Sequence, residues 1–163
     1  MKGSALSLCV KTQSYRLIYE LKTDGRRVHE LLSQHRELCW VHQSVGEVYA
    51  DTAAQAPLLH AELWELPYST YLTNFHKRVQ IEKRRPANLA EVLFFVEQFP
   101  IQVFGREIVA LDAPFHLKLG RIRRVWHAPS VYRGQYGVSV EAEPIEVFGQ
   151  NNLFALVFVP LPL

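Results

Sequence analysis

Apolar and polar residues alternate along much of the chain, and a period of two is typical of strands with one buried face. In residues 14–22, one face is formed by Tyr15, Leu17, Tyr19 and Leu21. Comparable runs occupy residues 39–50, 58–66, 115–126, 135–142, 145–148 and 153–159. Gly46 interrupts the first of these runs, and we expect a β-bulge there. Short strands separated by turn residues predict antiparallel pairing.

A spacing of three to four residues between apolar positions predicts helices in the first and middle thirds of the chain. The first helix begins after Asp24, a residue type that caps helix N-termini, and continues to Leu38. The second covers residues 72–79 and ends before Pro86, because the residue before a proline disfavours helix. The third follows residues 88–91, which resemble a capping box.

The order of these segments predicts a single α+β domain that spans residues 1–163. Two to three helices pack on a mainly antiparallel β-sheet, and the C-terminal half is rich in strands. No internal repeat, low-complexity segment or long linker divides the sequence. Gly105 and Arg106 lie between apolar positions and are the expected turn of a hairpin.

The segment LFALVFVPLPL, residues 153–163, is apolar on both faces, unlike a half-exposed strand. The pattern fits two arrangements. In the first, the segment is a central strand that the rest of the fold covers on both faces. In the second, it is the contact of a homo-oligomer, because an exposed apolar surface of this length otherwise promotes aggregation.

The composition is that of a globular chain and not of a disordered one, with 48% hydrophobic and 21% charged residues among 163. The longest apolar run is about half of the ~20 residues that span a membrane, and no secretory leader is recognisable. Cys9 and Cys39 match no metal or redox spacing, and two scattered thiols indicate a reducing compartment. We therefore expect a cytoplasmic protein without membrane contact; the spacing leaves a single disulfide between the two cysteines open.

Motifs for metal, nucleotide or nucleophilic chemistry are missing. The seven histidines include neither His-x-His nor His-Glu-x-x-His, and His60 with Glu62 on one strand face supplies only two ligands. A nucleophile elbow and glycine-rich phosphate loops are absent as well. The sequence therefore predicts no metal site and no cofactor.

A basic and aromatic stretch is the strongest candidate for a binding surface. Residues 113–140 contain no acidic residue and carry a formal charge of +5, against +2 for the whole chain. The candidate binding residues are Lys118, Arg121, Arg123, Arg124, Trp126, Tyr132, Arg133 and Tyr136. Arg121 and Arg123 alternate onto one strand face about 7 Å apart, close to the phosphate spacing of a nucleic-acid strand. The aromatic rings offer stacking platforms for unpaired bases.

The same stretch has a purely structural interpretation. If residues 119–127 pair with residues 135–143 and the loop lies at residues 129–134, Glu141 comes close to Arg121. Glu143 then lies near the start of the basic strand. Cross-strand pairs of opposite charge stabilise a hairpin and cancel the local field.

Two functions follow from these candidates. The leading one is a non-enzymatic binding or adaptor module that engages a phosphate-rich or acidic partner, such as single-stranded nucleic acid, through the strand pair at residues 118–136. The alternative is a small-molecule-binding domain or small enzyme, in which Arg121 or Arg123 clamps a carboxylate or phosphate. Its acid–base candidates are His116, His127 and Glu141. Whether the chain catalyses a reaction stays open at this point.

Overall fold

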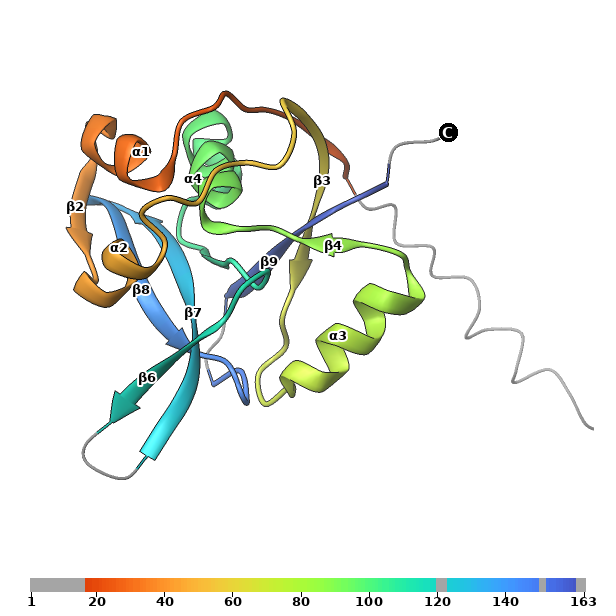
Figure 1. Ribbon diagram of the computed structural model, residues 1–163. Coiled ribbons are helices and arrows are strands. Elements are labelled where there is room, and N and C mark those ends of the chain that lie inside the picture. Colours follow the sequence, from red (N-terminus) through yellow and green to blue (C-terminus); the bar gives the residue numbers. More distant parts are fainter. Residues whose placement is uncertain (1–16, 120–122, 150–151, 161–163) are drawn as a thin grey trace, which may run out of the picture.

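The computed structural model describes residues 17–119, 123–149 and 152–160, and these form an α+β fold around one mixed sheet (Figure 1). The strands are β1 (Tyr19–Lys22), β2 (Leu38–Val41), β3 (Leu58–Glu65), β4 (Arg85–Pro86), β5 (Glu107–Val109), β6 (Phe115–Leu119), β7 (Arg123–Gly134), β8 (Gly137–Pro144) and β9 (Leu153–Phe158). The helices are α1 (Val28–Gln34), α2 (Gln43–Val48), α3 (Leu72–Ile81), α4 (Leu89–Gln98) and α5 (Pro100–Val103).

The strand order is β1-β3-β9-β5-β7-β8-β2, with β4 paired to β9 and β6 paired to β7 beside this path. The pairs β2–β8 and β5–β9 are parallel, and the other described pairs are antiparallel. The predicted α+β class, the mainly antiparallel sheet and the strand-rich C-terminal half are thereby confirmed. The structure has two described helices that were not predicted, α2 and α5. They contain six and four residues, too few for a clear helical spacing of apolar positions.

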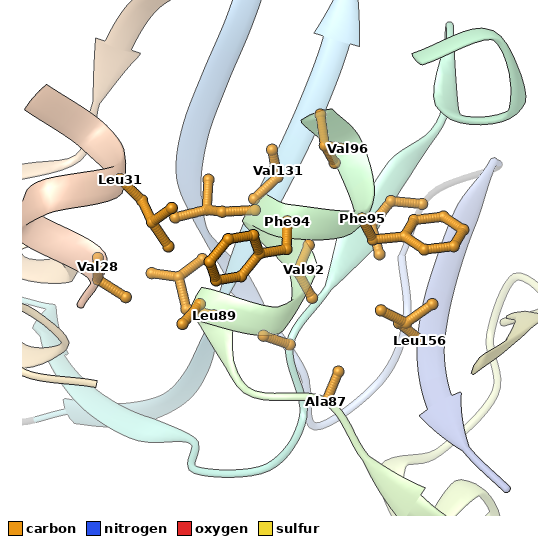
Figure 2. Close-up of a cluster of buried hydrophobic side chains, with 14 of the residues drawn as sticks. Val28, Leu31, Ala87, Leu89, Val92, Phe94, Phe95, Val96, Val131 and Leu156 are labelled. Carbon is orange, nitrogen blue, oxygen red and sulfur yellow. The ribbon is translucent and has the colours of Figure 1, made fainter. Parts of the chain in front are cut away.

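One face of the sheet is covered by α1, α2 and α4 (Figure 1). Helix α4 is enclosed around its whole circumference, since every residue from Leu89 to Val96 is buried, and Glu91 is the charged residue among them. Figure 2 shows Phe94 and Phe95 of this helix among side chains of α1 and the sheet, including Val131 and Leu156. The capping box predicted at residues 88–91 is confirmed, because the Asn88 side chain accepts a hydrogen bond from the Glu91 backbone N–H.

Helix α3 covers part of the opposite face. Its buried residues Phe75 and Val79 pack with Trp64 of β3 and with the alternate side chains of β9. Consequently, Leu156 faces the α4 side, and Ala155 and Val157 face the α3 side. Strand β9 is therefore an interior strand whose apolar faces the chain itself covers. The predicted oligomer contact through residues 153–163 gains no support from β9, and residues 161–163 lie outside the described part.

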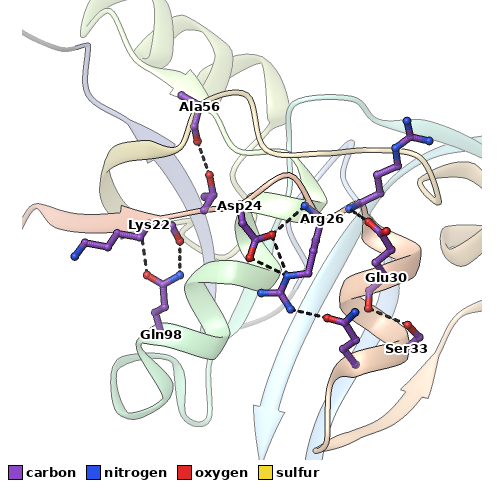
Figure 3. Close-up of polar contacts among 10 residues, drawn as sticks. Lys22, Asp24, Arg26, Glu30, Ser33, Ala56 and Gln98 are labelled. Carbon is purple, nitrogen blue, oxygen red and sulfur yellow. Dashed lines mark hydrogen bonds and ion pairs between the residues drawn. The ribbon is translucent and has the colours of Figure 1, made fainter.

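The first third of the chain differs from its predicted elements. Asp24 is not a helix cap; its carboxylate accepts hydrogen bonds of 2.9 Å from the backbone and the guanidinium of Arg26 (Figure 3). The N-cap of α1 is Arg27. The run at residues 39–50 is not one bulged strand, because β2 ends at Val41 and Gly46 lies within α2. Apolar residues at helical spacing, Val45 and Tyr49, become buried there and override the strand-like alternation.

Two predicted elements of the last third are also wrong. Gly105, at φ 72°, links α5 to β5 and is not the turn of a hairpin. Residues 145–148 form no strand, although Val147 makes an isolated bridge with Tyr71. Ile145 and Phe148 are buried instead under the α3 face, so their apolar character reflects loop packing.

Candidate functional site

The basic stretch of the sequence begins in a two-stranded ribbon. Residues 115–119 pair with residues 123–127, and we name this ribbon the arm. β8 pairs with β7 only from His127 onward, and β5 pairs with it further along. In Figure 1 the arm extends at the lower left, away from α1 and α4. The arm is thus an outlying part of the sheet, and only its base is continuous with the other strands.

The register of β7 differs from the predicted hairpin. The β7–β8 turn lies at residues 135–136, so Glu141 pairs with Ser130 and Glu143 pairs with Ala128. The arginine-bearing start of β7 pairs with β6 instead, where Arg124 lies opposite Lys118. Two-residue loops are the commonest hairpin connection, and this loop shifts the acids several positions away from the arm. The predicted register, with its loop at residues 129–134, is therefore wrong. Arg121, the predicted neighbour of Glu141, lies outside the described residues.

An aromatic pair lies on the arm. The rings of His116 and Trp126 are directly opposite across the two strands, with centroids 3.5 Å apart and planes inclined by 40°. Trp126 is 41% exposed. Strand alternation places positions 116, 118, 124 and 126 on one face of the arm, because directly paired residues share a face. The backbone thus brings two basic positions next to an accessible indole.

The other predicted binding residues lie at the far end of β7. Tyr132 and Tyr136 are exposed, and Tyr136 is located in the β7–β8 turn. Arg133 forms an ion pair with Glu37 across to the segment between α1 and β2. The structure therefore divides the predicted surface into two groups: the arm, and a second group at the turn whose arginine already has a carboxylate partner.

The acid–base candidates are not brought together. Glu141 accepts a hydrogen bond of 3.1 Å from the indole Nε1–H of Trp40. His127 is buried, with its Nδ1 2.9 Å from the carbonyl oxygen of Val125. His116 stacks on Trp126 on the arm. Because each group has a separate partner, the geometry gives no support to a His–Glu catalytic pair.

A carboxyl pair that sequence reasoning missed lies between β5 and β8. Glu107 accepts a hydrogen bond of 2.5 Å from the Ser130 hydroxyl, and it also contacts the carboxyl group of Glu143. Burial, together with the charge and hydrogen bond of Glu107, raises the pKa of Glu143 to about 7. The pair could not be predicted from the sequence, because Glu107 and Glu143 are far apart along the chain. They become neighbours because β5 and β8 both pair with β7.

This carboxyl pair should make stability depend on pH. The folded state holds the Glu143 proton more tightly than the unfolded chain, so stability is lost as the pH rises from about 4.5 through about 7. Glu143→Gln removes this loss, and the variant should gain about 1 kcal/mol over the parent protein between pH 5 and pH 8, after allowance for solvent screening. Urea unfolding at the two pH values measures the gain. A gain that does not depend on pH, or an equal gain for the exposed Glu146→Gln, would contradict the assignment.

A pocket of about 310 Å³ lies beside Arg133, between α1, α4 and β7. Its polar lining includes Arg26 and Arg133, but Asp24 and Glu37 already neutralise these two guanidinium groups. Arg121 and the side chain of Arg123 lie outside the described part of the structure, so the small-molecule clamp by Arg121 or Arg123 stays a prediction.

Residues 17–119, 123–149 and 152–160 offer neither a metal-ligand cluster nor a membrane-spanning helix. No three His, Cys, Asp or Glu side chains among these residues are arranged to hold a metal ion. In the same part of the chain, no helix has both the length and the apolarity required to cross a membrane.

Comparison with known proteins adds no relative. No family model matches the sequence, no curated protein matches it, and no solved structure matches the fold.

Proposed function

We propose that the chain is a binding module for single-stranded nucleic acid, which it engages through the arm. The observation that carries this proposal is the register of β7. It pairs Arg124 with Lys118 and Arg123 with Leu119 of β6. It also pairs Glu141 and Glu143 with Ser130 and Ala128. The positive charge of the arm therefore has no acidic cross-strand partner among the described positions.

The chemistry of the arm suits a phosphate backbone with unpaired bases. Basic positions that are paired across an antiparallel ribbon lie about 5 Å apart, and alternate positions along a strand lie about 7 Å apart. These separations permit contacts with successive phosphates. The accessible face of Trp126 provides a stacking platform, and base–aromatic stacking contributes about 1–3 kcal/mol per base. Phosphate contacts and base stacking do not read base edges, so we expect weak sequence preference.

Fluorescence anisotropy with a labelled oligo(dT) or oligo(U) at 50 and 200 mM salt tests the proposal. Arg123→Ala with Arg124→Ala should weaken binding about tenfold or more and lower the slope of log affinity against log salt by about two. Trp126→Ala should weaken binding by about tenfold and leave the slope unchanged, because stacking releases no counterions. The matched control is Arg36→Ala with Lys77→Ala, two exposed basic residues outside the arm.

Three outcomes would contradict the proposal. The first is the absence of binding at 50 mM salt. The second is an equal loss of affinity in the control variant, which would mean a general effect of net charge. The third is binding of polyglutamate with higher affinity than either oligonucleotide, which would assign the arm to an acidic protein partner.

A further inference from the structure

A second basic cluster of the sequence, residues 83–85, lines a pocket of about 270 Å³ between β3, β4 and β9. Its walls are largely apolar and include Leu58, Leu59 and Phe158. Among the described residues, every ionisable side chain in the lining is a histidine, lysine or arginine, and no carboxylate lines the pocket. The pocket shares no lining residue with the arm, and the proposed nucleic-acid function does not use it.

Arg85, which lines this pocket, has an unfilled hydrogen-bonding edge. Glu91 accepts hydrogen bonds of 3.0 and 2.9 Å from Nη1 and Nη2, and Nη1 also donates to the Pro86 carbonyl oxygen at 3.2 Å. A guanidinium has five N–H groups, so Nε–H and one Nη2–H remain, and no described residue accepts from them. These two groups are parallel donors on one side of the fork, the geometry that binds a carboxylate in a bidentate manner.

The guanidinium of Arg85 is also held in place. Its central carbon lies 4.6 Å from the centroid of the Phe158 ring, and Glu91, its carboxylate partner, is fully buried. The side chain is therefore ordered before any ligand arrives, which lowers the entropic cost of binding. Arg84, by contrast, directs its Nε and Nη2 to Glu62 and its Nη1 to the Glu82 carbonyl oxygen.

His60 contributes a further donor without a partner. Its Nδ1 is buried and accepts no hydrogen bond from the described residues, and nothing in that part of the chain bonds to Nε2 either. A buried Nδ1 without an acceptor disfavours protonation at that atom, because an unsatisfied buried N–H costs free energy. The neutral ring then carries its proton on Nε2, as a donor.

Lys83 adds a positive charge at the rim of the pocket. It is exposed and forms no ion pair with a described carboxylate, and its backbone lies in the left-handed region at φ 53°. A non-glycine residue in this region is uncommon and costs about 1 kcal/mol or more. The conformation directs the chain from α3 into β4 and brings three consecutive basic residues to one pocket.

We propose that this pocket binds a small monocarboxylate with a short hydrocarbon body. The carboxylate accepts hydrogen bonds from the open edge of Arg85 and from Nε2–H of His60, and the ammonium group of Lys83 adds a positive charge. The hydrocarbon body packs against Leu58 and Phe158. The volume of about 270 Å³ lies just below the range of about 300–1,000 Å³ for ligand pockets, so one short chain fills it.

Titration calorimetry of the whole chain with octanoate tests this proposal. We expect one saturable site that acetate does not saturate over the same range of concentration, because acetate lacks the hydrocarbon body. Lys83→Asn should weaken octanoate binding about tenfold, since it removes one charge-assisted contact. Asparagine tolerates the left-handed backbone, so this variant keeps the loop. Lys77→Asn on the exposed face of α3 makes the same change in net charge and should bind octanoate as the parent does.

His60→Leu gives a second measurement that does not involve a charge on the surface. It should weaken octanoate binding several-fold, and it should leave oligonucleotide binding at the arm unchanged. Octylammonium, with the same hydrocarbon body and the opposite charge, should not bind. The proposal is overturned if octanoate does not bind, if octylammonium binds equally well, or if Lys77→Asn weakens binding as much as Lys83→Asn. Arg85 is unsuitable for this test because it also neutralises buried Glu91.

Discussion

Replacing Glu91 by alanine is expected to lower the free energy of unfolding by about 3–5 kcal/mol. Glu91 has no exposed surface, and its carboxylate accepts hydrogen bonds from the Arg85 guanidinium and from the backbone N–H groups of Gln55 and Asn88. The substitution leaves a guanidinium and two N–H groups without their acceptor in a largely buried place. An unpaired buried charge is the costlier part of this loss.

Urea unfolding measured by circular dichroism checks this expectation. Glu97→Ala is the matched control, because Glu97 is an exposed residue of the same helix and its loss should change stability by no more than about 0.5 kcal/mol. The loss of stability in Glu91→Gln should lie between those of the two alanine variants, since the amide keeps the shape of the side chain and one acceptor oxygen. Equal stability of the Glu91→Ala and Glu97→Ala variants would show that the Glu91 contacts contribute nothing.

Gly137→Ala is expected to destabilise the fold by about 2–4 kcal/mol. Gly137 has a φ of 127°, which an L-residue rarely adopts, and a Cβ atom there would overlap with the carbonyl oxygen of Glu37. This oxygen accepts a hydrogen bond of 2.8 Å from Val138 N–H at the start of the β2–β8 pairing. Backbone strain and overpacking each contribute about 1–3 kcal/mol, and here both act at one position.

Gly105→Ala separates these two causes. Gly105 also has a positive φ, of 72°, but nothing lies within 4 Å of a Cβ atom at that position. Its substitution should cost about 1 kcal/mol from the backbone conformation alone. Thermal unfolding of both variants gives the comparison. If Gly105→Ala is as destabilising as Gly137→Ala, the close approach of the Glu37 carbonyl is not the cause.

Elements with strong local signals were predictable from the sequence. The capping box at Asn88 and Glu91 fixes the start of α4, and the alternation of residues 58–66 fixes β3. Residues 39–50 were not predictable in the same way, because QSVGEV alternates like a strand and is also spaced like a helix. Burial of Val45 against the core decides between the two, and burial depends on contacts with distant parts of the chain.

The residues of the candidate site were predictable from the sequence, but the register in which β7 pairs with its neighbours was not. The basic and aromatic residues were identifiable, but two turns were compatible with the pattern, one at residues 129–134 and one at residues 135–136. β5 helps to select the second, since Val109 pairs with Ser130 and continues the sheet there. The ligand-binding edge of Arg85 could not be predicted at all, because it depends on which of its five N–H groups Glu91 occupies.

The interior place of β9 has a consequence for the order of folding. β9 follows every other described element in the sequence, yet it lies between β3 and β5 and also pairs with β4. Until β9 has been synthesised, β3 and β5 have no strand between them, and the sheet consists of two separate parts. Pairings between residues so far apart in sequence slow folding and leave strand edges exposed meanwhile. We therefore expect the sheet to close in a late, slow step, after both parts have formed.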